Sequence, residues 1–277
     1  MTINQTMPQT TEIIKTIEPI KTIENPPHLA SQTIFQFAVS IGEALLESGG
    51  EIFRVQGTIE RVLRYYGIFS YQVFVLSNGI FATVLEGTPE QESIVRNVPL
   101  GSIHLGKIAR LNQLSRDICD GMYSLDEAYE KLEEVKAMPR LPLPVFILIG
   151  GMGSGAFCYL MKGGVREMAV AFVLGIALQS FLAFTEHRKA SKFLAYILGG
   201  FLITTICLAL KHFGFTFAED TAIIGTITIM VPGVALTTSI RELFMGDYLS
   251  GCIKLMDAVL TGMCIATGVG TAFLLPW

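Results

Sequence analysis

The stretch from Leu141 to Met161, LPLPVFILIGGMGSGAFCYLM, contains no charged residue. A helix needs about 20 mainly apolar residues to cross the ~30 Å hydrocarbon core of a bilayer, and this stretch has that length. Comparable runs follow at Met168–Phe184, Phe193–Leu210, Thr221–Ile240 and Leu255–Leu275. The sequence therefore predicts a multi-pass α-helical membrane protein with about five transmembrane helices.

The composition limits the expected partners. Of the 277 residues, 51% are hydrophobic and 16% are charged, so the lipid bilayer is expected to cover part of the chain. The net charge of -4 and the lack of a basic tract argue against nucleic acid as a partner. The five cysteines occur singly, without the spacing of metal ligands. No metal site, cofactor or disulfide framework is predicted.

Most acidic residues precede Arg140, which predicts two parts with different solvents. Residues 1–30 alternate Thr, Ile, Lys, Glu and Pro, and are predicted to be a disordered tail. Residues 31–140 are predicted to form an N-terminal cytosolic α/β domain. Residues 141–277 are predicted to form the five-helix transmembrane domain.

Within the cytosolic domain, a helix is expected from Ser31, because apolar residues recur at threes and fours. These are Ile34, Phe37, Ala38, Ile41, Ala44 and Leu45. Tyr71–Leu76 and Ile80–Leu85 are expected to form a β-hairpin in which Asn78-Gly79 supplies positive φ angles. A further strand is expected over Glu92–Val98 and a helix over Leu105–Cys119.

Two S-x-x-E spacings predict capping boxes, in which the serine and the glutamate each cap a backbone amide at a helix start. The first is Ser48 with Glu51, and the second is Ser124 with Glu127. Each is expected to begin a new helix.

Lys and Arg residues near the span ends set the orientation of a membrane protein. With the N-terminal domain inside, the cytosolic side holds Lys131, Lys136, Arg140, Arg188, Lys189, Lys192, Arg241 and Lys254. The outer side holds Lys162, Arg166 and Lys211. The excess inside predicts a cytosolic N-terminal domain and Trp277 at the outer face of the cell (inner) membrane.

The glycine-rich run from Gly150 to Gly155 is not predicted to bind a dinucleotide, because it lies inside an apolar span and follows no strand. Gly151 and Gly155 instead have the small-x-x-x-small spacing that lets helices pack closely in lipid. Gly262 and Ala266 have the same spacing.

The fourth run carries the densest polar stretch of the membrane half. Pro232 and Gly233 are expected to break the helix, and broken helices line substrate cavities in transporters. The residues predicted to bind substrate are Pro232, Gly233, Thr237, Thr238, Ser239 and Arg241. The Arg241 guanidinium suits a carboxylate. Asp257 is the predicted proton-coupling residue, which either takes up and releases a proton or pairs with Arg241 between cycles. Alternatively, the stretch is a hydrated loop and Asp257 pairs with Lys254.

These residues resemble a known family. PGVALTTSIREL (232–243) and GDYLSGCIKLMDA (246–258) are similar to the C-terminal signature of the threonine/serine exporter family. GEALLESGGEIFRV (42–55), SNGIF (77–81) and HLGKIARLNQLSRDICDGMYSLDEAYEKLEEV (104–135) resemble its cytosolic domain. The resemblance covers Thr33 to Leu275. The departures are Thr238 for the usual Asn, Ala235 for Pro, Asp257 for Glu and Gly50 for Ala.

The resemblance implies a secondary exporter of small carboxylate-bearing metabolites, either threonine and serine or succinate-type dicarboxylates. Members are single chains with ten spans or pairs of proteins, and this chain resembles the larger partner of a pair. A small five-span membrane subunit is then an expected partner, and association with further copies of the chain stays open. An ion gradient is the expected energy source, since no P-loop is present.

A membrane-anchored hydrolase-like enzyme or sensor is the alternative. The family's soluble domain has been described as hydrolase-like, which implies Glu47, Ser48, Glu51 and Arg54 as a cytosolic-domain site, with His104 as a base. The capping box accounts for Ser48 and Glu51 without chemistry. A transporter with no catalytic residue is therefore predicted.

Overall fold

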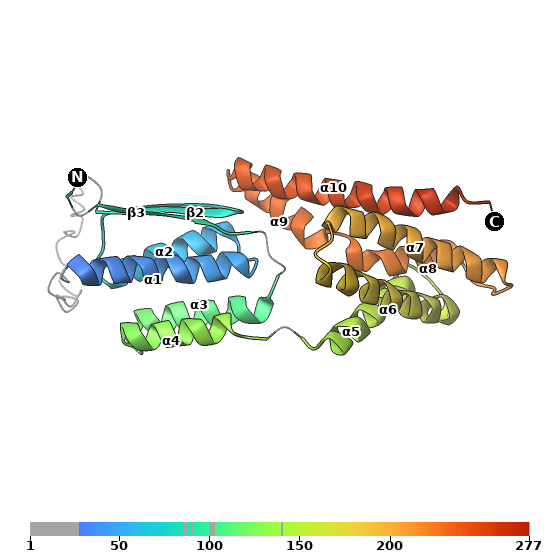
Figure 1. Cartoon of the computed structure of the whole chain (residues 1–277), viewed down its shortest axis with the longest axis horizontal. Coiled ribbons are helices and arrows are strands. Elements are labelled where there is room, and N and C mark those ends of the chain that lie inside the picture. The colour runs from blue at the N-terminus through green and yellow to red at the C-terminus, as the bar shows by residue number, and fades with distance from the viewer. Residues whose placement is uncertain (1–27, 86–87, 90, 100–102, 140, 277) are drawn as a thin grey trace, which may run out of the picture. The chain divides into compact units, whose positions relative to one another are not determined.

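The computed structural model describes residues 28–85, 88–89, 91–99, 103–139 and 141–276. It separates into two compact units, Met1–Ala137 and Met138–Trp277 (Figure 1). The expected tail lies outside the described residues up to residue 27. The first helix begins at His28, three residues before the expected domain start.

The described residues of the first unit form four helices and one small sheet. Its elements are α1 (His28–Glu47), α2 (Ile52–Tyr65), β1 (Tyr71–Leu76), β2 (Gly79–Val84), β3 (Glu92–Asn97), α3 (Leu105–Cys119) and α4 (Leu125–Lys136). The strands pair antiparallel in the order β1-β2-β3. The predicted strands and helices are present, but the β content of the predicted α/β domain is limited to this three-stranded meander.

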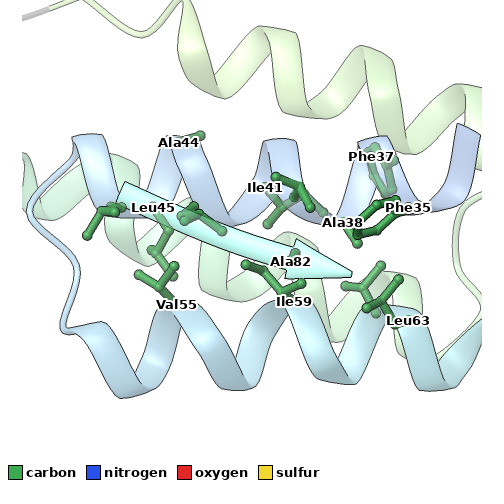
Figure 2. Close-up of a cluster of buried hydrophobic side chains, with 14 of the residues drawn as sticks. Phe35, Phe37, Ala38, Ile41, Ala44, Leu45, Val55, Ile59, Leu63 and Ala82 are labelled. Atoms are coloured by element: carbon green, nitrogen blue, oxygen red, sulfur yellow. The ribbon is translucent and has the colours of Figure 1, made fainter. Parts of the chain in front are cut away.

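Helix α1 forms the centre of the first unit. It packs against α2, α3, α4 and the strands β2 and β3, so apolar residues on several of its sides are buried. Figure 2 shows Phe37 and Ile41 of α1 in a cluster with Ile59 of α2 and Ala82 of β2. The helical period noticed in the sequence marks only one face of α1, whereas Phe35 and Val39 are also fully buried.

The β1–β2 hairpin is confirmed, but its turn differs from the expected one. Leu76 pairs with Gly79, so the loop consists of Ser77 and Asn78. Neither Asn78 nor Gly79 has a positive φ angle. Gly79 instead has a close neighbour, because a Cβ there would lie 3.2 Å from the carbonyl oxygen of Arg96 on β3, a tight contact.

The two predicted capping boxes have different outcomes. At α4, the Ser124 hydroxyl accepts a hydrogen bond from the Glu127 N–H, and the Glu127 carboxylate accepts one from the Ser124 N–H at 2.8 Å, as predicted. At α2, the N-cap is Glu51 and no side chain caps the helix. The first capping box is therefore wrong.

Ser48 belongs to the end of α1 rather than to the start of α2. Gly49 has a φ of +82°, its N–H donates to Leu46, and the N–H of Gly50 donates to Leu45. This is a Schellman motif, in which a left-handed glycine satisfies the last carbonyls of a helix. The Ser48 hydroxyl donates to the Ala44 carbonyl of its own helix at 2.7 Å and does not cap α2.

The second unit is helical throughout its described residues. Its elements are α5 (Leu143–Leu160), α6 (Val165–His187), α7 (Lys192–His212), α8 (Glu219–Ile227), the 3-10 turn η2 (Thr228–Met230), α9 (Gly233–Phe244) and α10 (Tyr248–Phe273). Four helices, α5, α6, α7 and α10, are long and apolar enough to cross a membrane. The bent pair α8–α9 raises the number to five if it forms one span.

The spans start and end within a few residues of the predicted positions, except at the start of α10. It begins at Tyr248, seven residues before the predicted Leu255. Asp247 caps this longer helix by accepting a hydrogen bond from the Ser250 N–H at 3.2 Å. Lys254 and Asp257, expected near a span start, therefore lie in the second and third turns of α10.

Glycines determine where the membrane helices approach each other. A Cβ at Gly151 would lie 2.9 Å from the Phe172 carbonyl oxygen, and one at Gly155 would lie 3.1 Å from that of Met168, so both glycines pack α5 against α6 as predicted. Gly262 has nothing within 4 Å of such a Cβ. The second predicted packing motif therefore makes no helix contact through Gly262 in the described part of the chain.

Candidate functional site

The break between α8 and α9 follows from its proline. The residue before a proline is forced out of the helical region, and Val231 is extended, with φ −66° and ψ 125°. Pro232 has φ −80° and ψ 53°, and the Gly233 N–H donates to the Val231 carbonyl at 2.8 Å. This inverse γ-turn bends the helix pair by 58°.

The three hydroxyls predicted near the break donate to their own helix. Thr237 donates to the carbonyls of Gly233 and Val234, both at 3.0 Å. Thr238 donates to the Val234 carbonyl at 2.8 Å, and Ser239 donates to the Leu236 carbonyl at 2.8 Å. Their hydrogens are occupied, so these hydroxyls present mainly acceptor lone pairs to a bound molecule.

Helix α9 divides the predicted site between two faces. Ser239 and Glu242 are buried, and a Cβ at Gly251 of α10 would lie 3.0 Å from the Ser239 carbonyl oxygen, so this face packs against α10. Thr237 and Arg241 are four residues apart on the exposed side of α9. The Arg241 guanidinium and the Thr237 hydroxyl thus share a face of α9 that the other described residues of the unit leave exposed.

Asp257 pairs with a residue that the sequence did not suggest. Its carboxylate lies 2.8 Å from the ammonium group of Lys192, at the start of α7. Lys254, the alternative partner, forms an ion pair with Glu242 of α9. The ion pairs therefore connect α10 to α7 and to α9, the two helices against which it packs.

The two glutamates and the arginine of the cytosolic-domain site lie around the α1–α2 connection. Glu47 is exposed, and the Glu51 carboxylate pairs with Arg54 at 3.1 Å within the first turn of α2. This pair is a local interaction between residues three apart, of a kind that stabilises helix starts.

Ser48 and His104 meet, but through their backbones. The His104 N–H donates to the Ser48 carbonyl at 3.0 Å, while the His104 imidazole accepts the Lys107 N–H as the N-cap of α3. The Ser48 hydroxyl is turned to Ala44. A nucleophile and base must share a hydrogen bond, and these two side chains do not share one. Among the described residues, no group of His, Cys, Asp and Glu could hold a metal ion.

The comparison with protein families gives a match over nearly the whole chain. The model of the threonine/serine exporter family, ThrE, matches residues 36–275. The chain belongs to the threonine/serine exporter family. The family description is that of a transporter, and the apolar helices of the second unit agree with a multi-pass membrane protein.

Among curated relatives, the threonine/serine exporter of Corynebacterium glutamicum is 23% identical over 266 residues, which is 91% of this chain and 53% of the relative. The chain thus spans about half the length of that exporter. The "Probable succinate transporter subunit YjjP" of Klebsiella aerogenes is 22% identical, over 81% of this chain and 87% of the relative. The protein of the same name in Escherichia coli is 21% identical, over 86% and 93%. No solved structure matches.

Sequence reasoning missed the Glu242–Lys254 pair. The only partner considered for Lys254 was Asp257, whereas α9 and α10 form a helical hairpin around Met245–Asp247 that brings Lys254 to Glu242. Glu242 lies near the end of α9, and Lys254 lies in the second turn of α10. The signal that could have revealed the pair is Asp247 followed by Ser250, a helix start that extends α10 back towards the turn.

Proposed function

We propose that this exporter-family protein is the larger subunit of a secondary exporter that moves small carboxylate-bearing metabolites out of the cell. The relatives' lengths support a split exporter: the chain matches about half of a threonine/serine exporter but most of proteins named as transporter subunits. A smaller five-span membrane subunit would supply the remainder. Threonine, serine and succinate are the substrates to test first, since the relatives carry these names.

In this proposal the second unit crosses the inner membrane five times and the first unit is cytosolic. A re-entrant pair must reverse its direction, whereas a 58° bend leaves α9 running onward from α8. The pair connects the end of α7 to the start of α10, as a fourth span would (Figure 1). The excess of Lys and Arg on the first unit's side supports the orientation.

The substrate site in this proposal is formed by Pro232, Gly233, Thr237, Thr238, Ser239 and Arg241. The broken, hydroxyl-rich α8–α9 pair is the observation that carries it, because irregular backbone at membrane depth is tolerated only beside protein or a water-filled cavity. A helix that only anchored a cytosolic enzyme would need no such break. Arg241 binds the substrate carboxylate, and Asp257, paired with Lys192, exchanges the coupling proton.

Efflux from proteoliposomes that contain the chain and its smaller subunit tests this function. Vesicles that contain the wild-type proteins and are loaded with labelled succinate or L-threonine should release one of these substrates faster than protein-free vesicles loaded in the same way. Arg241→Lys should slow release, because an ammonium group cannot make the planar two-oxygen contact. Arg188→Lys, at the end of α6 and outside the site, is the matched control. A release rate equal to that of protein-free vesicles for every substrate tested would contradict the proposal.

The proton role has its own measurement. Asp257→Asn should leave substrate binding measurable while removing the response of efflux to an imposed pH gradient. Wild-type efflux that ignores the gradient, together with an undiminished Asp257→Asn rate, would leave Asp257 as a structural partner of Lys192.

The orientation can be tested by labelling from outside. Phe215 lies exposed between α7 and α8. A single cysteine at this position, in a chain without its native cysteines, should react with an impermeant maleimide in intact cells. Reaction of a cysteine in the first unit instead would reverse the proposed topology.

A further inference from the structure

The Glu242–Lys254 pair is the most buried ion pair of the second unit's described residues. The side chains of Lys254 and Glu242 are 19% and 8% exposed. The corresponding values are 45% and 30% for Lys192–Asp257, and 50% and 29% for Lys211–Glu219. Burying two charges costs free energy that their attraction alone seldom recovers, so such a pair is weak evidence of a purely structural role.

The carboxylate of Glu242 is only half satisfied. Its Oε1 atom contacts the Lys254 ammonium group, whereas Oε2 is buried and has no hydrogen-bond partner in the described part of the chain. A buried oxygen that has lost water without gaining a hydrogen-bond donor costs free energy. The pair is therefore closer to separation than a fully hydrogen-bonded one.

A second unpartnered group lies one helical turn before Lys254. The hydroxyl of Ser250 is fully buried and has no hydrogen-bond partner among the described residues. Residues four apart share one face of a helix, so Ser250 and Lys254 both lie on that side of α10. An ammonium group and a free hydroxyl donor together match the two oxygens of a carboxylate.

The other charged groups around the pair are engaged elsewhere or exposed. Asp247, in the α9–α10 turn, accepts the Ser250 N–H. Asp257 of α10 pairs with Lys192, the charged residue of α7 that faces α10 there. Arg241 lies on the exposed side of α9. Tyr248 and Cys252, the remaining titratable groups of this part of α10, are exposed. Glu242 therefore has Lys254 as its direct counter-charge.

We propose that Lys254 is a second receptor for the carboxylate of the exported metabolite, and that Glu242 occupies this receptor when no substrate is bound. The inference rests on the proposed function. Substrate binding then exchanges one carboxylate for another: the Glu242 carboxylate leaves Lys254 and takes a proton, and the substrate carboxylate pairs with the ammonium group and the Ser250 hydroxyl. One anion and one proton enter together, so the net charge of the site is unchanged.

This exchange has a measurable consequence for affinity. Since binding takes up a proton at Glu242, the wild-type protein binds substrate more tightly as the pH falls. Glu242→Gln removes both the competing anion and the proton. Its affinity should be about tenfold higher than that of the wild type at neutral pH, equivalent to about 1.4 kcal/mol, and should no longer depend on pH.

Titration calorimetry on the purified chain with its smaller subunit in nanodiscs tests the exchange, with succinate and L-threonine as probes. Lys254→Gln should weaken binding by about tenfold or more, as expected when one partner of a buried charge pair is removed. The double variant Glu242→Gln/Lys254→Gln leaves no unpaired charge, so it should fold and still bind weakly. Glu219→Gln removes the more exposed pair with Lys211 and is the matched control.

The outcomes separate the inference from the function. Wild-type affinity that is independent of pH, with Glu242→Gln unchanged or weaker, would overturn the exchange and leave a structural pair. Binding by the double variant equal to that of the wild type would exclude Lys254 as a receptor. If the wild-type complex neither binds nor exports either probe, the proposed function fails, and the inference fails with it.

Discussion

The interiors of the two units differ in the size and polarity of their buried side chains. In the first unit the largest fully buried side chains are Phe35, Phe37, Ile41, Leu45, Ile59, Leu63, Ile80, Leu111, Ile118 and Leu132. In the second unit the buried positions of α5 are Gly151, Ser154, Gly155 and Cys158. The large apolar residues of that helix, such as Met152 and Phe157, are exposed.

The difference follows from the solvent. In water, burying apolar surface stabilises a fold by about 25 cal/mol per Å², so the first unit places its large side chains inside. In a bilayer the lipid tails are as apolar as leucine, and helices associate through close packing of small residues and polar contacts. Large-to-small changes should therefore damage the first unit, and small-to-large changes the second.

The largest expected effect is Phe37→Ala in the first unit. Phe37 is fully buried and its ring lies 4.5 Å from that of Tyr129, so removing it leaves a cavity and should cost about 3–5 kcal/mol. Hydrogen exchange of the α1 amides in the full chain would measure the loss. Phe74→Ala is the control, since Phe74 is 57% exposed on the sheet. Equal losses for both variants would break the comparison.

Gly268→Ala in α10 is the opposite change, in the second unit. A methyl group at Gly268 would overlap the carbonyl oxygen of Ile197 on α7, so the two helices must separate, at a cost of about 1–3 kcal/mol. Gly262→Ala, on the open side of the same helix, should be neutral. Thermal unfolding in detergent would distinguish them. A neutral Gly268→Ala would show that α7 and α10 do not rely on close backbone contact.

The glycines also show how far sequence reasoning reached. Spacing alone identified Gly151 and Gly155 as contact positions, but Gly262 meets no neighbour in the described residues, and the contact at Gly268 was missed. The small-x-x-x-small pattern specifies a helix face but not which neighbour covers it. The five apolar runs were readable because hydrocarbon thickness fixes their length, whereas the faces depend on tertiary packing.

A smaller effect separates the two S-x-x-E spacings of the first unit. Ser124→Ala removes a formed cap and should cost about 1 kcal/mol. Ser48→Ala should cost less, because the Ala44 carbonyl keeps the Ser48 N–H as a donor at 3.1 Å. Melting temperatures of the full chain and the two variants would test the order. A larger loss for Ser48→Ala would contradict the assignment of Ser48 to the end of α1.

The candidate site was predictable in its residue types but not in its pairings. Pro232 broke the helix where expected, because a missing N–H and a fixed φ act locally. The ion partners of Asp257 and Lys254 come from α7 and α9, and their choice depends on how three helices pack. Local rules predicted the break, whereas only the packing revealed which charges meet.

The smallest expected effect is a pH dependence confined to the α4 cap. Hydrogen bonds from the Ser124 N–H and hydroxyl hold the pKa of Glu127 below its ordinary value of 4.5. A carboxylate with a lowered folded-state pKa stabilises the fold above its unfolded-state pKa, and this contribution is lost as the pH falls through the folded-state pKa. The α4 cap should therefore weaken in acid.

Glu127→Gln isolates this contribution, because the glutamine oxygen can still accept the Ser124 N–H but carries no charge. Near neutral pH the wild type should melt at a slightly higher temperature than the variant. The difference should shrink as the pH falls through the lowered pKa of Glu127, since both side chains are then neutral. Glu130→Gln, on the exposed middle of α4, is the control for a general change in net charge. A wild-type advantage that persists in acid would mean that the Glu127 charge contributes nothing to the cap.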